Sequence, residues 1–243
     1  MDFGTVIKNA TPLLLEGLKY TALVSILAII FGIILGLLLC IMKMSKVGVL
    51  RFISGAYIWI IRGTPMLVQA FLIFFGFPQL FNLINGAING MVGFEMMSTS
   101  FRFDALTAGI ITLSLNASAY MAEIFRGGIL AIPKGQEEAA RSLGLSKSKT
   151  YLKVILPQAF KISIPSLVNQ FIISIKDTSI LSCIGLAEIV NKAKTYVGST
   201  YQFFATYILV AVFYLIIISL LMILTNYLEK RLKYEQKRHR DSH

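Results

Sequence analysis

The sequence predicts an all-α integral membrane protein, and three observations lead to this prediction. The 243 residues are 56% hydrophobic and only 14% charged, with a mean hydropathy of +0.73, whereas soluble domains carry about 25% charged residues. Five apolar runs are each long enough to cross the hydrocarbon core, which takes about 20 helical residues. The basic residues between these runs lie mainly on one side. We therefore expect a single transmembrane domain over residues 1–243, with five transmembrane helices.

The five predicted spans follow one another with polar connections between them. They cover Leu18–Met42, with an amphipathic start from Phe3, then Phe52–Phe81, Phe103–Phe125, Ile162–Ile184 and Phe203–Leu228. The connection Asn82–Arg102 is rich in Asn, Gly, Met and Ser, so it is predicted to be exposed. No internal repeat is visible, and five spans cannot form two equal inverted halves. This argues against a secondary carrier built on inverted repeats.

The distribution of Lys and Arg predicts the orientation. Of the 23 basic residues, sixteen lie on the side that holds residues 127–160 and the tail 229–243, and five lie on the other side. Five acidic residues on each side leave the whole excess of +11 with the first group. By the positive-inside rule that side is cytoplasmic, so the N-terminus is outside and the C-terminus inside. The positive charge is thus an orientation signal, and we expect no nucleic acid partner.

The predicted spans contain no histidine and no evident nucleophile–base pair or set of metal ligands. The only histidines, His239 and His243, lie in the tail, and Cys40 and Cys183 lie in apolar runs, where buried thiols are expected. An intramembrane enzyme would need a nucleophile–base pair or metal ligands, so we expect no catalytic residue, metal site or disulfide. The chain also lacks a Gly-x-x-x-x-Gly-Lys-Ser/Thr phosphate-binding loop. We therefore expect no cofactor on this chain, with any ATP hydrolysed on another polypeptide.

The basic segment Gly135–Pro157 is predicted to form two short cytoplasmic helices. Gln136–Leu143 favours the first helix. Glu137 and Glu138 stand at the end where the helix dipole stabilises negative charge. Gly144 is expected to stop this helix as a C-terminal glycine.

Ser146 is expected to cap the second short helix, Lys147–Leu156, which Pro157 ends. Small and apolar residues share one side of the first helix, where a partner backbone could approach closely. They are Ala139, Ala140 and Leu143. We interpret the segment as a docking surface for a soluble partner. The alternative is a helix lying on anionic lipid, which explains the lysines but not the alanine face or the glycine stop.

The same residues resemble a known family. Glu138-Ala139-Ala140, then Gly144 and Ile155-Leu156-Pro157, resemble the EAA loop of bacterial ABC importer permeases. Three further segments are similar to the polar amino acid branch of these permeases. They are Tyr57–Pro65 followed by Val68-Gln69, Ala119–Glu123 followed by Arg126-Gly127-Gly128, and Lys176-Asp177-Thr178-Ser179. The resemblance covers nearly the full length apart from Asn82–Arg102, which is longer than usual.

This resemblance implies a type I ABC importer permease fold that works as a pair, with a second copy or a paralogue. Two ATPase subunits would bind ATP and Mg on the cytoplasmic side, and a soluble substrate-binding protein would dock outside. The substrate would be a polar amino acid of the His/Glu/Gln/Arg/opine or cystine type, and the location a bacterial cytoplasmic membrane. The EAA helix would couple to the ATPase through residues of the loop. These are Glu138, Ala139, Ala140, Leu143, Gly144 and Pro157.

Polar residues recur every three or four positions along the fourth predicted span, which places them on one helical face. They are Ser163, Ser166, Gln170, Ser174 and Asp177. Asn169 and Lys176 form a second stripe alongside. The stripe is either the wall of a wet cavity, which makes Gln170 a candidate substrate contact, or a polar seam between helices. The seam explains the serines but leaves Asp177 in need of a cation, such as Lys176 or Arg62.

A zwitterionic substrate needs a carboxylate for its α-ammonium group and donors for its carboxylate. Asp177 suits the first role, and Lys176, Thr178 and Ser179 are candidates for the second. This segment is also one of those that resemble the amino acid permeases. One Asp does not distinguish a cationic side chain from any α-amine, so the particular amino acid stays open.

Other polar residues of the spans have two interpretations each. Asn116 and Ser118 either contact substrate or belong to a packed interface. Arg62 stands beside a predicted helix break at Gly63 and Pro65, where it either lines the path or anchors the structure. Glu123 and Arg126, three positions apart, are expected to pair. An ion channel or a secondary amino acid carrier is the alternative function, but it leaves the docking loop unexplained.

Overall fold

The chain is helical throughout the part that the structure describes. This computed structural model describes the backbone of residues 3–92 and 100–241 and the side chains of residues 3–91 and 100–227. No strand occurs among these residues, which confirms the all-α prediction. The elements are α1 Phe3–Met44, α2 Gly48–Gly63, α3 Met66–Phe71, η1 Leu72–Gly76, α4 Phe77–Val92, α5 Ala105–Leu130, α6 Lys134–Ser142, α7 Lys147–Thr150, η2 Tyr151–Ile155, α8 Leu156–Asp177, η3 Thr178–Ile184, α9 Ile189–Thr200 and α10 Phe203–Asp241. Of the η elements, η1 and η2 are π-helical and η3 is a 3-10 helix.

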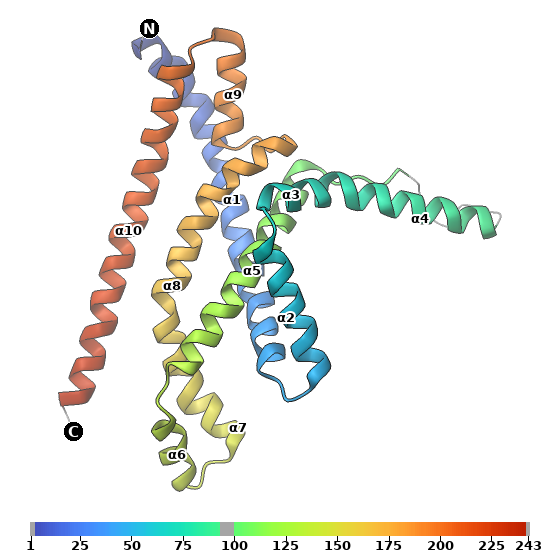
Figure 1. Cartoon of the computed structure of the whole chain (residues 1–243). Helices are drawn as coiled ribbons and strands as arrows, with labels where there is room; N and C mark the ends of the chain where they lie inside the picture. The colour runs from blue at the N-terminus through green and yellow to red at the C-terminus, as the bar shows by residue number, and fades with distance from the viewer. Residues whose placement is uncertain (1–2, 93–99, 242–243) are drawn as a thin grey trace.

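Five helices of the described chain are long and apolar enough to cross a membrane, the number predicted. They are Phe3–Met44, Met66–Met91, Ala105–Leu130, Lys147–Ile184 and Phe203–Tyr227. The N-terminus and the C-terminus lie at opposite ends of the bundle, with the C-terminus toward α6 and α7 (Figure 1). An odd number of crossings requires this separation.

The second predicted span, Phe52–Phe81, was wrong as a single helix. α2 ends at Gly63, and the backbone of Thr64 and Pro65 is extended. Proline has no N–H to continue a helix and disfavours helical geometry in the residue before it. The predicted break beside Arg62 is thereby confirmed, and it separates the predicted span into two helices.

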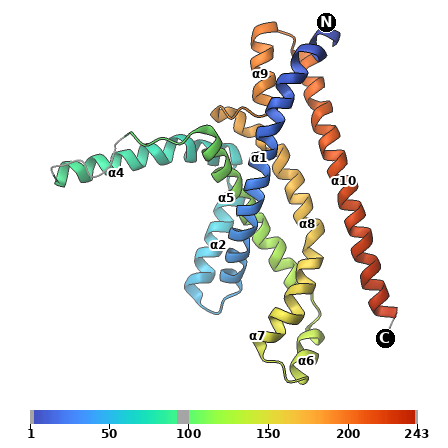
Figure 2. The same cartoon turned by 180° about the vertical axis from the view of Figure 1, so that it is seen from behind.

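The apolar stretch after this break starts at Met66 and continues into the predicted connection Asn82–Arg102. The first part of that connection is therefore helical, as the end of α4, while residues 93–99 lie outside the described residues. α3, η1 and α4 run across the direction of α1, α5, α8 and α10 (Figures 1 and 2).

The centre of the bundle is the contact between α1 and α5. A Cβ atom added at Gly36 would lie 2.8 Å from the Cβ of Met121, and one at Gly32 would lie 3.1 Å from the Cβ of Ala117. Small residues of this kind let transmembrane helices approach closely. In the most apolar part of α5, 61% of the residues are buried, against 6% for α10. α5 is therefore central, and α10 leaves most of its surface free for lipid or another chain.

Pro157 does not end a helix, which corrects the sequence-based expectation. α7, η2 and α8 form one continuous helix through it, and Pro157 stands in the first turn of α8. In η2 the N–H of Leu156 donates to the carbonyl oxygen of Tyr151, five residues back. A π turn widens the helix directly before the proline, whose ring would otherwise collide with the preceding turn.

Candidate functional site

The polar face of α8 divides between packed and open positions. Ser163 is buried and donates to the carbonyl oxygen of Ala159 at 2.9 Å, close to α5. Ser174 is also buried, and its hydroxyl finds no hydrogen-bond partner among the described residues. Ser166 and Asn169 are exposed. The seam interpretation thus describes Ser163 and Ser174. Gln170 is buried as well, Asp177 is half-buried, and Ser166 is open.

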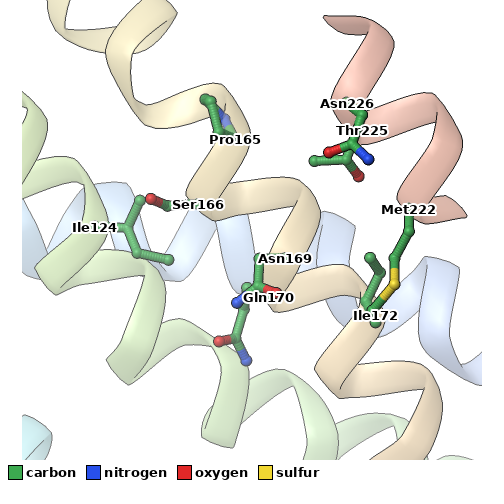
Figure 3. Close-up of a pocket in the computed structure, with 9 residues that line it drawn as sticks. All are labelled: Ile124, Pro165, Ser166, Asn169, Gln170, Ile172, Met222, Thr225 and Asn226. Atoms are coloured by element: carbon green, nitrogen blue, oxygen red, sulfur yellow. The ribbon is translucent and has the colours of Figure 1, made fainter. Parts of the chain in front are cut away.

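The open part of α8 lines a pocket of about 560 Å³ that also involves α5 and α10 (Figure 3). Its lining consists of Ile124, Pro165, Ser166, Asn169, Gln170, Ile172, Met222, Thr225 and Asn226. Thr225 and Asn226 come from α10 and face α8 across the opening (Figure 3). Three amides and two hydroxyls therefore offer both donors and acceptors to a polar molecule, and none of these side chains is charged.

Asp177 and Lys176 lie outside this pocket. They follow Gln170 by six or seven residues, about 10 Å along a helix axis, at the end of α8 where η3 begins. Asp177 is half-buried and forms no ion pair within the described residues, and Lys176 is exposed. Neither Lys176 nor Arg62 closes an ion pair with Asp177. Its carboxylate is therefore available.

The hydroxyls of Thr178 and Ser179 already donate to the helix that they end. Thr178 Oγ1 donates to the carbonyl oxygen of Ile175, and Ser179 Oγ donates to that of Lys176, both at 2.7 Å. Thr178 is fully buried and Ser179 half-buried. Ser179 would therefore have to rotate its hydroxyl to donate to a substrate carboxylate.

Asn116 and Ser118 lie in the packing between α5 and the α2–α3 break. Asn116 Nδ2 donates to Gln69 Oε1 at 3.0 Å, while Gln69 Nε2 donates to the carbonyl oxygen of Ile61. Ser118 Oγ lies 2.9 Å from the hydroxyl of Tyr57. Neither residue lines the pocket on α8. Sequence reasoning missed the partnership with Gln69, because 47 residues separate the two amides.

Arg62 belongs to a second pocket, of about 460 Å³, between α2 and α5. Its guanidinium carbon lies 5.2 Å from the ring centroid of Tyr120, which is cation–π geometry. Glu123 of the same pocket pairs with Arg126 at 2.7 Å, as predicted, and also with Lys43 at 2.5 Å. Lys43 was missed because it comes from α1, eighty residues away in the sequence.

The loop between α5 and α8 has the predicted helix stop. Gly144 has a φ of +80°, the left-handed region that glycine tolerates best. The N–H of Leu145 donates to the carbonyl oxygen of Ala140, and the N–H of Gly144 to that of Arg141. This is the Schellman arrangement. Ser146 caps α7 by accepting from the N–H of Lys149, as predicted.

Ala139, Ala140 and Leu143 were predicted to share one accessible side, and this prediction was wrong for Ala140. Ala140 is only 5% exposed, whereas Leu143 is 84% exposed. Ala139 is exposed too, and so is Glu138. Positions 139 and 143 are four apart and share a side, while Ala140 is rotated toward the chain's own η2 and α7. Glu138 and Ala139 of α6, and Leu143 directly after it, are therefore accessible to a partner, whereas Ala140 is not.

Sequence reasoning also missed Glu188, in the connection between the fourth and fifth spans. Glu188 is fully buried and caps α9, accepting from the N–H groups of Val190 at 2.9 Å and Asn191 at 2.6 Å. The hydroxyl of Tyr214 donates to it at 3.4 Å. Burial raises the pKa of the Glu188 carboxyl to about 7. The only sequence signal was an acid directly before a helix.

A bundle of membrane-crossing helices, a polar pocket between them and an exposed helical loop together define a membrane transport subunit. The chain belongs to the family described as binding-protein-dependent transport system inner membrane components, whose model matches residues 28–234. These proteins are permease components of ABC importers.

Two relatives and one solved structure illustrate the similarity. The L-cystine transport system permease protein TcyB of Bacillus subtilis strain 168 is 42% identical over 91% of this chain and 87% of its own length. The glutamine transport system permease protein GlnP of Escherichia coli K12 is 38% identical over 92% of this chain and 94% of its own. The crystal structure of an amino acid ABC transporter with histidines matches with a TM-score of 0.82 and 37% identity, covering 95% of this chain and 99% of that one.

Proposed function

We propose that this chain is the permease subunit of an ATP-driven importer of polar amino acids. The observation that supports this most directly is the arrangement on α8, where the unpaired carboxylate of Asp177 stands beside the exposed ammonium of Lys176. Seven residues away, amide and hydroxyl groups line an uncharged pocket. An amino acid zwitterion could replace its hydrating water molecules with these groups, either at the charged end of α8 or at the pocket.

The relatives support the substrate class. Cystine and glutamine, named for the two relatives, share the α-ammonium and α-carboxylate groups but differ in their side chains. The residues on α8 suit the shared groups. Polar amino acids, including cystine-like derivatives, are therefore the proposed class. Asp177, Lys176, Ser179 and Gln170 are the proposed contacts.

The geometry gives less support to the other candidate residues. Asn116, Ser118 and Thr178 are buried and hydrogen-bonded within the chain, so we assign them a positioning role. Arg62 lines a separate pocket beside Tyr120. Its exposure leaves it able to contact a neighbouring chain or the transport path.

Energy would come from a partner ATPase that binds ATP and Mg and contacts α6. The fixed C-terminal stop at Gly144 and the exposed Leu143 give this short helix a defined shape and an apolar contact point. These are features of a helix that inserts into a groove. Glu138 and Ala139 would line the same contact.

The proposed orientation places the N-terminus and α9 outside and α6, α7 and the C-terminal tail in the cytoplasm of a bacterial cell. The basic residues support it. A soluble substrate-binding protein would then dock near α9, where Lys194, Thr195 and Tyr201 are exposed. A second permease copy or a paralogue would cover part of the sparsely packed α10.

Reconstitution into vesicles with the partner ATPase and binding protein tests the proposal. We expect uptake of a polar amino acid that requires ATP inside the compartment holding the ATPase. Omission of the ATPase is the control. Uptake that persists without ATP or without the ATPase would instead support a channel or a secondary carrier.

A further inference from the structure

Among the long apolar helices of the described residues, α4 alone does not follow the direction of the bundle. By length and composition it belongs to a helix, Met66–Met91, that could span a bilayer. However, it runs across α1, α5, α8 and α10 in two opposite views (Figures 1 and 2). A helix in this direction cannot cross the bilayer that the other four cross. The second of the five crossings is instead made by α2, which runs back alongside α1 up to the break at Thr64 and Pro65 (Figure 1). α4 must lie along a surface or contact another molecule.

The base of α4 is fixed at the level where two spans end. Ile73 and Phe74, just before α4, pack against the buried cluster that contains Leu181 and Ile184 of η3. The fourth candidate span ends at Ile184. The third candidate span begins at Ala105, which packs on the same cluster. α4 therefore leaves the bundle at a boundary between hydrocarbon and water, at the end opposite α6 and α7.

The two sides of α4 differ sharply in polarity. At 100° per residue, Leu80, Ile84, Ile88 and Met91 share one side with Phe77 and Phe81. Gln79, three asparagines and two glycines share the other. The whole helix contains no charged residue. The apolar residues are free, with Leu80 56% and Met91 87% exposed.

The polar side faces the chain that returns to α5. Asn82 donates to the carbonyl oxygen of Phe101 at 3.0 Å and accepts from its N–H at 2.9 Å. Two residues of the apolar side, at the start of α4, also reach this chain: the ring centroids of Phe81 and Phe101 are 4.9 Å apart, and Phe77 stacks on Phe103 at 5.9 Å. The returning chain lies on the side of α4 that faces away from α2 and α6 (Figures 1 and 2). The exposed apolar residues Leu80, Ile84, Ile88 and Met91 therefore face back toward the level of the membrane.

We infer that α4 is an interfacial helix whose apolar side lies on the outer leaflet of the bilayer. The level at which α4 leaves the bundle, and the direction that its apolar side faces, match the boundary of the bilayer. α4 carries no charge, so its binding to lipid would depend only on the apolar area that it buries and not on the charge of the headgroups. The paired hydrogen bonds of Asn82 and the phenylalanine contacts hold α4 at this angle.

Tryptophan fluorescence in lipid vesicles tests this inference. The chain has a single tryptophan, Trp59, so a Trp59→Phe background allows one reporter at a time. Ile84→Trp and Met91→Trp report on the apolar side, and Gln79→Trp is the matched control on the polar side. The full-length chain is reconstituted with lipids brominated either near the headgroup or near the end of the acyl chain.

We expect quenching at Ile84→Trp to be several times stronger with bromine near the headgroup than near the chain end. Gln79→Trp should respond mainly to iodide in the water. Stronger quenching by the deep bromines would show a crossing helix and overturn the inference. Equal lipid quenching on both sides, or none on either, would also overturn it and favour a protein partner. Met91→Trp repeats the test if Ile84→Trp does not assemble.

Discussion

Two carboxylates within the spans, Glu123 and Asp177, are surrounded very differently. Glu123 on α5 is held between Lys43 of α1 and Arg126 of its own helix, at 2.5 and 2.7 Å. Asp177 at the end of α8 is half-buried and has no ion pair within the described residues. An unpaired charge inside a membrane protein costs free energy, so such a residue is usually present because it has a function. Glu123 therefore holds helices together, and Asp177 is free to meet a ligand.

Two apolar residues in the loop between α5 and α8, Ala140 and Leu143, differ in the same way. Ala140 is buried against its own chain, and Leu143 is the most exposed apolar side chain of that loop. In both regions, the residue whose contacts are complete supports the fold. The residue whose contacts are incomplete is the better candidate for binding.

The largest effect is expected at Asp177. Asp177→Asn keeps the shape but removes the charge, and losing one partner of a desolvated charge pair costs about 2–5 kcal/mol. Uptake should fall roughly 30-fold or more, while the yield of assembled complex stays normal. Uptake and detergent-solubilised yield are measured on the same preparation. Normal uptake would refute a role for this charge, and low yield would make Asp177 structural.

Glu123→Gln should give the opposite pattern. It leaves Lys43 and Arg126 without their carboxylate and is expected to cost about 1–2 kcal/mol of stability, since the cluster is partly screened by solvent. Yield and thermal stability should fall, while uptake per assembled complex changes little. The double variant Lys43→Met/Glu123→Gln should lose little more than Glu123→Gln alone. Additive losses would show that the two residues do not act together.

Glu188 offers a test through pH. Its folded pKa of about 7 lies above the ordinary value of 4.5, so its contribution to stability is fully present below pH 4.5 and is lost as pH rises through about 7. The Tm of the wild-type chain should fall by a few degrees across this window. Glu188→Gln, which cannot ionise, should show a smaller fall. Identical pH profiles would contradict the burial of this carboxyl as the cause.

The smallest effect is expected from Leu143→Ala. Its side chain touches little, so stability should change by less than about 0.5 kcal/mol. Retention of the ATPase during purification should nevertheless weaken, because an apolar anchor is lost. Ala140→Arg is the matched comparison, and it should disrupt α6 itself by forcing charge into a buried position. Full ATPase retention by Leu143→Ala would remove this residue from the proposed contact.

Local signals in the sequence were sufficient for several features of this protein. The apolar runs gave the number of candidate spans, and Gly144 and Ser146 gave the stop and the cap of the loop helices. Gly63 and Pro65 marked the break after α2. These features depend on residues within a few positions of one another, where composition and backbone preference decide the outcome.

Features that join distant segments were not accessible in this way. The direction of α4 depends on the packing of Ile73 and Phe74 against η3. The Gln69–Asn116 contact and the Lys43–Glu123 pair depend on how α1, α3 and α5 meet. The regular polar stripe on α8 hid the difference between Ser163, which faces α5, and Ser166, which faces an opening.

The sequence by itself determined the membrane class, the helical content, and the stop and cap of the loop helices, and it named the candidate residues for contact with a zwitterion. Only the tertiary structure decided which polar groups are already satisfied, that Ala140 turns inward, and that α4 leaves the bundle sideways. The physical reason is that hydropathy and capping are properties of neighbouring residues. Whether a polar or apolar group finds a partner is settled only when remote helices come into contact.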